Sequence, residues 1–189
     1  MKSSHLFNPK HIAFLEAEDR RIWRNPEEIL NDVKVLPNFI VADLGCGSGY
    51  FTLALSRMAK KVYAIDIQKE MLSFLEDKIR RLKIKNVELV LSKPDEIPLE
   101  NEGVDFLMSI NTLHEFGDKD KVIKEMRRVI KRGCNLLIAD FKKEKMSFGP
   151  PVRIRVAEDK AIKLFEERGF VLSKADNLPY HYLLVFTKD

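Results

Sequence analysis

The sequence predicts an α/β fold, in which a mostly parallel sheet carries helices on both faces. Short runs of apolar and β-branched residues alternate with segments of helical spacing, as in sheets whose parallel strands are joined by helices. The first run, residues 39–42, leads through an acid into a glycine-rich turn. A second run, residues 62–67, carries an acid about 20 residues beyond that turn, as in Rossmann-like sheets.

The composition is that of one globular domain. The chain has 189 residues, of which 45% are hydrophobic and 33% charged, so it can bury a sizeable core. No stretch approaches the ~20 apolar residues that cross a bilayer, and the polar start, residues 1–5, lacks the apolar segment of a signal peptide. We therefore expect a single cytoplasmic domain over residues 1–189, without a membrane span.

Residues 1–37 are expected to form a helical extension ahead of a core that spans residues 38–189. Asn25 and Pro26, followed by two glutamates, have the pattern of a helix N-cap, a proline at the first helical position and acids in the first turn. Apolar residues before Trp23 indicate another short helix. Covering an edge of the sheet is one role for such helices.

The glycine-rich turn has the spacing G-x-G-x-G, formed by Gly45, Gly47 and Gly49 with Cys46 after the first glycine. Glycine lets a ligand approach the backbone closely. The dinucleotide fingerprint is G-x-G-x-x-G, which this spacing does not match. Asp43, two residues before the first glycine, suits a cationic group better than a pyrophosphate, because unlike charges attract.

Asp66 ends the core of the second apolar run, and Ile67 follows it. In Rossmann-like sheets a carboxylate at this place binds ribose hydroxyls. A second interpretation, compatible with the first, is that Asp66 caps the helix that begins nearby.

The stretch from Phe39 to Tyr50 resembles the cofactor loop of class I S-adenosylmethionine (SAM) dependent methyltransferases. A second stretch, residues 109–116, resembles the family strongly and follows the strand predicted over 104–110. The chain resembles the small, single-domain methyltransferases of the ubiquinone and menaquinone biosynthesis type, and the resemblance covers about residues 28–189. The resemblance implies a Rossmann-like seven-stranded sheet with an antiparallel final strand, S-adenosyl-L-methionine as cofactor, and an N-terminal extension that acts as a lid.

The same resemblance implies which residues hold the cofactor. The acid matching Asp43 lies near the methionyl end of SAM, and relatives often carry an acid near the adenine amino group where this chain has Lys93. By register Asp95 matches a second acid of that loop, and backbone amides with apolar side chains such as Ile67 or Met71 are alternative adenine contacts. The predicted cofactor-binding residues are Asp43, Gly45, Cys46, Gly47, Gly49, Asp66, Ile67, Asp95 and Asn111.

His114 is the predicted catalytic residue, because its segment borders the position of the transferred methyl group. It could take a proton from the acceptor or orient it. Alternatively, its imidazole bonds a backbone carbonyl and holds the turn.

The remaining elements follow from spacing and turn residues. A helix with an apolar stripe is predicted over 71–82, another helix begins at Asp118 and is closed by Gly133, and Gly169 ends a helix over 157–168. Two closing strands joined by a short turn must be antiparallel. The other predicted strands span 86–91, 135–140, 170–174 and 180–188.

The sequence predicts no metal site and no disulfide. The four histidines are scattered, and Cys46 and Cys134 lie at opposite ends of the predicted sheet, too far apart to bond. The net charge is +4, with acids and bases mixed along helices rather than gathered in a basic stripe, so binding of nucleic acid is not expected.

We expect transfer of the sulfonium methyl group to a small-molecule nucleophile by in-line displacement. An RNA or protein methyltransferase with the same core is the alternative, and a NAD-type oxidoreductase or a non-catalytic nucleotide-binding module is a third. The basic residues of the loop over 141–155 could bind an anionic small acceptor or an RNA phosphate, although a solvated loop is the simpler interpretation. Its basic residues are Lys142, Lys143, Lys145, Arg153 and Arg155.

Overall fold

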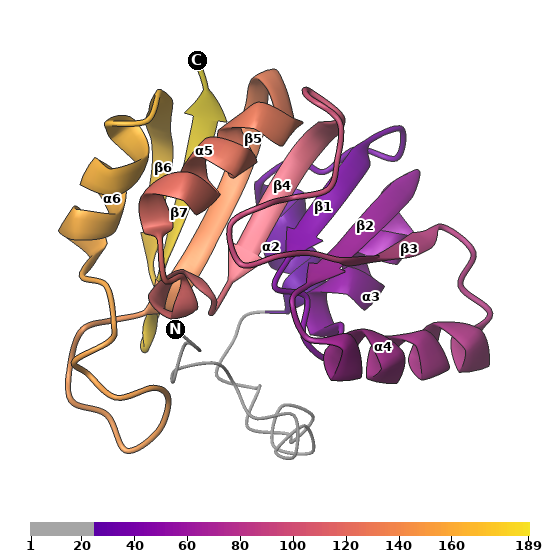
Figure 1. Ribbon diagram of the computed structural model, residues 1–189. Coiled ribbons are helices and arrows are strands. Elements are labelled where there is room, and N and C mark those ends of the chain that lie inside the picture. Colours follow the sequence, from indigo (N-terminus) through magenta and orange to yellow (C-terminus); the bar gives the residue numbers. More distant parts are fainter. Residues whose placement is uncertain (1–24) are drawn as a thin grey trace.

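A computed structural model describes residues 25–189 as a seven-stranded sheet with helices on both faces (Figure 1). The strands are β1 (Ile40–Leu44), β2 (Lys61–Asp66), β3 (Val87–Leu91), β4 (Val104–Ile110), β5 (Ile130–Phe141), β6 (Phe170–Asn177) and β7 (His181–Lys188). The helices are α2 (Pro26–Asp32), α3 (Tyr50–Met58), α4 (Lys69–Leu82), α5 (Lys119–Val129) and α6 (Glu158–Glu166), with a 3₁₀ turn, η3 (Leu113–Glu115). Predictions for residues 1–24, including Trp23 and most of the lid, lie outside the described residues.

The strand order is β3-β2-β1-β4-β5-β7-β6. The pairs from β3 to β5 are parallel, and β7 runs antiparallel to both of its neighbours, β5 and β6. The predicted fold class, an α/β Rossmann-like sheet with an antiparallel final strand, is confirmed. The order reverses between β1 and β4, where open α/β sheets bind their ligands.

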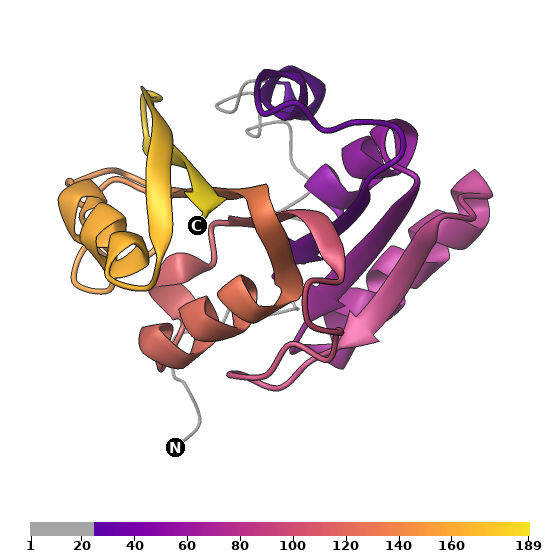
Figure 2. The ribbon, with the colours of Figure 1, turned by 90° about the horizontal axis from the view of Figure 1, so that it is seen from above.

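The two faces of the sheet bury separate cores. Figure 2 shows α5 and α6 on one side and α2 with α3 on the other. Buried residues of α5 and α6, such as Met126 and Phe165, pack with Leu107 of β4 in one cluster. Leu30 of α2 and Leu55 of α3 pack with Val41 of β1 in another. Parallel strands buried on both faces have continuous apolar runs, which is why the sequence revealed them.

Several predicted boundaries are confirmed, and their caps are visible. Asn25 accepts a hydrogen bond from the backbone N–H of Glu27 at 3.0 Å, and Asp118 accepts one from Lys121 at 3.1 Å. Gly169, with φ of 77°, donates its N–H to Glu166 at 3.1 Å just beyond α6. β4 has the predicted bounds.

Two predictions at the end of α5 and α4 were wrong. Gly133 does not close a helix, because α5 ends at Val129 and Gly133 lies inside β5. β5 begins with the buried Ile130, which pairs with Val104, and the register then shifts before the next pair. Leu82 was placed on the buried stripe of α4 but is 56% exposed at the end of that helix.

The ends of β1 and β4 meet in a close contact beneath the glycine-rich turn. Gly45 has φ of 76°, and a Cβ atom there would clash with Cγ2 of Thr112. The hydroxyls of Thr112 and Ser109 are hydrogen-bonded to each other, and Ser109 donates to the carbonyl of Leu44 at 3.0 Å. The glycine therefore permits both the left-handed backbone and the packing of the two strand ends.

We expect Gly45→Ala to lower the free energy of unfolding by roughly 2–4 kcal/mol, from overpacking and from the left-handed backbone. Thr112→Ser removes the clashing methyl group and keeps the hydroxyl. In the Thr112→Ser background, Gly45→Ala should lower the free energy of unfolding by only about 1–2 kcal/mol, which is the cost of the left-handed backbone alone. Urea unfolding of the four proteins measures the coupling. If Gly45→Ala lowered the free energy of unfolding equally with Thr112 and with Ser at position 112, the contact between Gly45 and the Thr112 methyl group would be contradicted.

Candidate functional site

The glycine-rich turn is held on two sides. The N–H groups of Gly45 and Cys46 donate to the carbonyl of Ile65 at 2.8 and 3.0 Å, which ties the turn to β2. On the other side, the buried Lys78 of α4 donates from Nζ to the carbonyl of Ser48 at 3.0 Å. Between these anchors, a Cβ on Gly47 would meet no atom of residues 25–189 within 4 Å. The turn therefore offers open backbone at Gly47, where a ligand can approach.

Asp66 lies at the end of β2 and binds the turn through its carboxylate. Oδ2 accepts from the N–H of Gly47 at 3.0 Å, and Oδ1 accepts from the N–H of Gln68 at 2.9 Å, the predicted capping contact. Burial raises the pKa of Asp66. The hydrogen bonds from backbone N–H groups lower it, but burial has the larger effect. A carboxylate has about four lone-pair sites, so these two bonds leave capacity for ligand hydroxyls.

Asp43 lies at the end of β1, almost completely buried. It accepts a hydrogen bond from the hydroxyl of Thr52 in α3 at 2.6 Å. Burial raises the pKa of Asp43 to about 7; the Thr52 bond opposes this shift, and the charge of Asp66 adds to it. A cationic ligand beside Asp43 would favour its ionised form.

Asn111 follows β4 and has a left-handed backbone, with φ of 58°. Its N–H donates to the carbonyl of Ala139 at 2.8 Å, but its buried Oδ1 has no hydrogen-bond partner among residues 25–189. A buried acceptor left without a donor costs about 1–3 kcal/mol. This oxygen is therefore ready to accept from an amine or a hydroxyl of a ligand.

His114 lies in η3 and is paired with Asp140 at the end of β5. Its Nδ1 is 2.7 Å from Oδ1 of Asp140, and its backbone N–H donates to the other carboxylate oxygen at 2.8 Å. With Nδ1–H donating, Nε2 of a neutral ring is the lone-pair nitrogen. Nε2 is 3.8 Å from Oε1 of Glu115, so two carboxylates flank the ring. The predicted bond to a backbone carbonyl is replaced by this bond to a carboxylate.

The loop over 141–155 is solvated at Lys143, Lys145 and Arg153, which are exposed, but Arg155, expected among its basic surface residues, is buried and the segment folds around it. Arg155 is 3% exposed, and its guanidinium donates at 2.7–3.2 Å to four backbone carbonyls of this segment. It therefore cannot face an anionic acceptor freely. Phe148 of the same segment packs with Phe141 and Tyr180, whose ring centroids are 6.4 and 4.8 Å away.

A second histidine lies beside this aromatic group. His181 packs against Phe141, with ring centroids 4.3 Å apart and ring planes tilted by 45°. Burial lowers its pKa to about 3, helped by the nearby charges of Arg155 and Lys142. His181 is therefore neutral at ordinary pH.

The loop after β3 points its charges outward. Asp95 is paired with Lys121 of α5 at 3.3 Å, and the 73% exposed Lys93 side chain is paired with Glu96 at 2.6 Å. The structure brings Asp43, Asp66 and the glycine turn together, but Asp95 is engaged with α5. Cofactor binding by Asp95 stays a prediction, as does that by the half-buried Ile67.

Sequence reasoning missed three side chains of this region. Asp140 has the signal that identified Asp43 and Asp66, an acid at the end of a buried strand. Lys78 interrupts the apolar stripe of α4, which is a signal for a lysine with a buried partner. Ser92 follows β3 and had no signal beyond its position.

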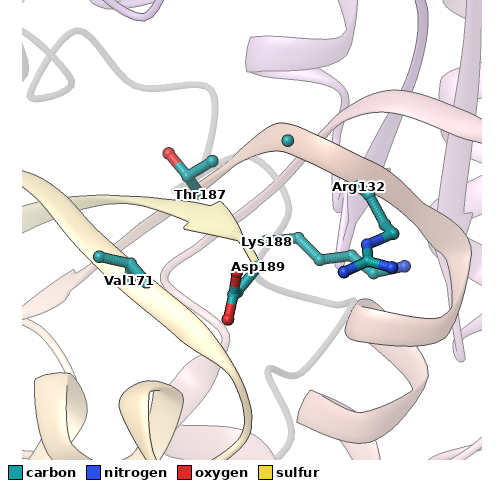
Figure 3. A pocket seen from close by; sticks show the side chains of 6 residues that line it. Arg132, Val171, Thr187, Lys188 and Asp189 are labelled. Atoms are coloured by element: carbon teal, nitrogen blue, oxygen red, sulfur yellow. The ribbon is translucent and has the colours of Figure 1, made fainter.

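A separate hollow of about 430 Å³ opens at the other end of the sheet (Figure 3). Nζ of Lys188 there is bound to Glu102 at 3.0 Å and to the carbonyl of Ile130 at 2.7 Å. The hollow is remote from the polar strand ends. Its lining residues are Arg132, Gly133, Val171, Thr187, Lys188 and Asp189.

Across residues 25–189, no helix is long and apolar enough to span a bilayer. Over the same residues, no three side chains of the metal-binding types gather as a site would require. Cys46 and Cys134 are free thiols, the first buried and the second half-buried.

Comparison with known proteins agrees with this geometry. A family model described as a methyltransferase domain matches residues 37–174. A SAM-dependent methyltransferase structure from Aquifex aeolicus is 31% identical, with a TM-score of 0.92, covering 97% of this chain and 100% of that one. A putative type 11 methyltransferase structure from Sulfolobus solfataricus is also 31% identical, with a TM-score of 0.73, covering 89% and 94%.

A curated relative is the demethylmenaquinone methyltransferase of Bacillus mycoides, 30% identical over 128 residues, which are 66% of this chain and 53% of the relative. The match thus spans about half the length of that relative. The fold and the strand-end residues define a Rossmann-like methyltransferase domain. The chain belongs to the class I SAM-dependent methyltransferase family, whose methyl donor is SAM, and is distantly related to demethylmenaquinone methyltransferases.

Asp43 should make stability depend on pH. Its folded-state pKa of about 7 lies above that of an unfolded aspartate, so the folded protein keeps the proton longer, and stability falls as pH rises from about 4 to about 7. Asp43→Asn removes this loss and can still accept from Thr52. Relative to wild type, the variant should gain about 1.4 kcal/mol per pH unit within that window. Urea unfolding across the window measures it, and parallel profiles would refute it.

Proposed function

We propose that the protein transfers the methyl group of SAM to a small-molecule nucleophile by in-line displacement, within one domain over residues 1–189. The observation that carries the proposal is the row of polar groups along consecutive strand ends. Asp66 lies at the end of β2, Asp43 and the open Gly47 lie at the end of β1, and Asn111 follows β4, in the order of the sheet.

The residues of this row fit the parts of SAM. Asp66 has free lone-pair capacity for ribose hydroxyls, and Gly47 leaves room for the chain that joins the ribose to the amino acid. Asp43 and Oδ1 of Asn111, which has no partner in the described part of the chain, suit a cationic amine. NAD is a poorer fit, since its pyrophosphate would lie near two carboxylates.

When bound, SAM supplies a methyl group already activated by its attachment to a sulfonium. The protein then has mainly to place the nucleophile and to exclude water, and positioning alone lowers a barrier by about 7–11 kcal/mol in favourable cases. For a hydroxyl or amine acceptor, we propose that His114 takes the proton at Nε2. Asp140 fixes the tautomer, and both flanking carboxylates stabilise the ring once it is charged.

Three observations favour a small acceptor over RNA or protein. The side of the site beyond His114 carries aromatic side chains, including Phe141 and Phe148. The guanidinium of Arg155 is occupied by backbone carbonyls, so it is not available for a phosphate. The curated relatives are named for methylating demethylmenaquinone, a small molecule. The acceptor itself and the oligomeric state are left open.

Titration calorimetry tests the cofactor assignment. We expect SAM and its demethylated product to bind with similar heats to one site, and NAD not to bind. Asp66→Ala should weaken SAM binding by about 1–3 kcal/mol, the range for lost hydrogen bonds to a charged group. Glu88→Ala, on the exposed part of neighbouring β3, is the control and should bind SAM normally. Binding of NAD without SAM would overturn the proposal.

Kinetics test the role of His114, once formation of demethylated SAM has identified an acceptor among hydroxyl, amine and thiol compounds. We expect His114→Asn to lower kcat by about 10²-fold or more and to leave the Kd of SAM unchanged. Asp140→Asn should lower kcat as well and change its pH profile, because it removes the partner of Nδ1. Unfolding of both variants at ordinary temperature would support a structural role instead.

A further inference from the structure

Ser92 presents a buried hydroxyl that nothing in the described structure satisfies. Its side chain follows β3, it is 9% exposed, and its Oγ has no hydrogen-bond partner within residues 25–189. The backbone N–H of Ser92 donates to the carbonyl of Asp66 at 3.0 Å. This bond places the backbone of Ser92 beside the end of β2, one strand from Asp66 and on the side away from the glycine turn.

A buried hydroxyl without a partner is costly, by about 1–3 kcal/mol, and native proteins keep few of them. Two such polar atoms lie at the two ends of the same row of strand ends, Ser92 after β3 and Asn111 after β4. Neighbouring strands are about 4.8 Å apart, so the four strand ends span about 14 Å. An extended nucleoside with an amino-acid tail fits this length, with one unsatisfied group near each end.

The direction of that ligand follows from charge. The cationic end of SAM belongs beside Asp43 and Asn111, and the ribose belongs at Asp66. The base must then lie on the far side of the ribose, toward the end of β3. Ser92 is the buried polar side chain at that end.

The charged side chains that follow Ser92 are paired with other residues. Lys93 is exposed and bound to Glu96, and Asp95 is bound to Lys121. Adenine presents an exocyclic amino group, a donor that needs an acceptor. A serine oxygen has two lone pairs and can accept it without a charge.

We propose that Oγ of Ser92 accepts a hydrogen bond from the exocyclic amino group of adenine and so selects the base of the cofactor. The inference rests on the proposed use of SAM and names a residue for its adenine end. It assigns to a neutral hydroxyl a contact that relatives make with an acid at the position of Lys93.

A binding cycle tests this contact. S-adenosylhomocysteine and its analogue without the 6-amino group are titrated into wild type and Ser92→Ala. We expect the substitution to weaken binding of S-adenosylhomocysteine by about 5-fold or more, the size of one net hydrogen bond. It should leave the affinity for the analogue unchanged. The control is Ser173→Ala on the distant β6, which removes a hydroxyl that donates to the carbonyl of Val185. It should change neither affinity.

Thermal unfolding of the ligand-free proteins separates binding from structure. Because Oγ of Ser92 has no partner to lose within residues 25–189, Ser92→Ala should not lower the Tm. An equal loss of affinity for both ligands, or a lower Tm with the loss, would overturn the assignment in favour of a structural role. Unchanged affinity for S-adenosylhomocysteine would also overturn it but leave the proposed function standing. If wild type binds neither SAM nor S-adenosylhomocysteine, the proposed function itself fails.

Discussion

The hydrogen bond from Gly47 to the Asp66 carboxylate, at 3.0 Å, is the contact on which the site depends. It joins the first strand–helix turn to the end of the second strand and so sets the path of the glycine loop. The parallel pairing of β1 with β2 brings the two acids at their ends close enough for the charge of Asp66 to raise the pKa of Asp43. Two buried carboxylates that repel each other are stabilised by a cation between or beside them, so this region favours binding of a cationic group.

Much of the fold was predictable because parallel strands buried on both faces need continuous apolar runs. β4 was found with its exact bounds, and the antiparallel closing strands followed from their short connection. The error at Gly133 has a physical cause. Val129 ends α5 and Ile130 begins β5, and both are buried. The apolar pattern of the helix therefore continues into the strand and does not indicate where the helix ends.

The site was predictable where one residue type at one strand end carries the signal, as for Asp43 and Asp66. Pairings between strands were not predictable in this way. His114 and Asp140 are 26 residues apart and meet because β4 and β5 are neighbours. Arg155 was read as part of a basic surface, since a sequence shows charge but not the carbonyls that fold around it. The unsatisfied state of Ser92 likewise exists only in the folded protein.

The two halves of the site differ in charge in a way that suits transfer from a cation. On the side proposed for the cofactor, the carboxylates of Asp43 and Asp66 favour a positively charged ligand. On the acceptor half, His181 is neutral because burial holds its pKa at about 3, and the charge of Arg155 is bound by backbone carbonyls. The pair of His114 and Asp140 stands between these halves. A nucleophile that has given up its proton is more negative, and its reaction with a cationic donor neutralises both charges. A region of low dielectric destabilises the separated charges and so favours this reaction. In the proposed reaction, the aromatic rings around Phe141 exclude water, Asp43 and Asp66 hold the donor, and His114 moves the proton.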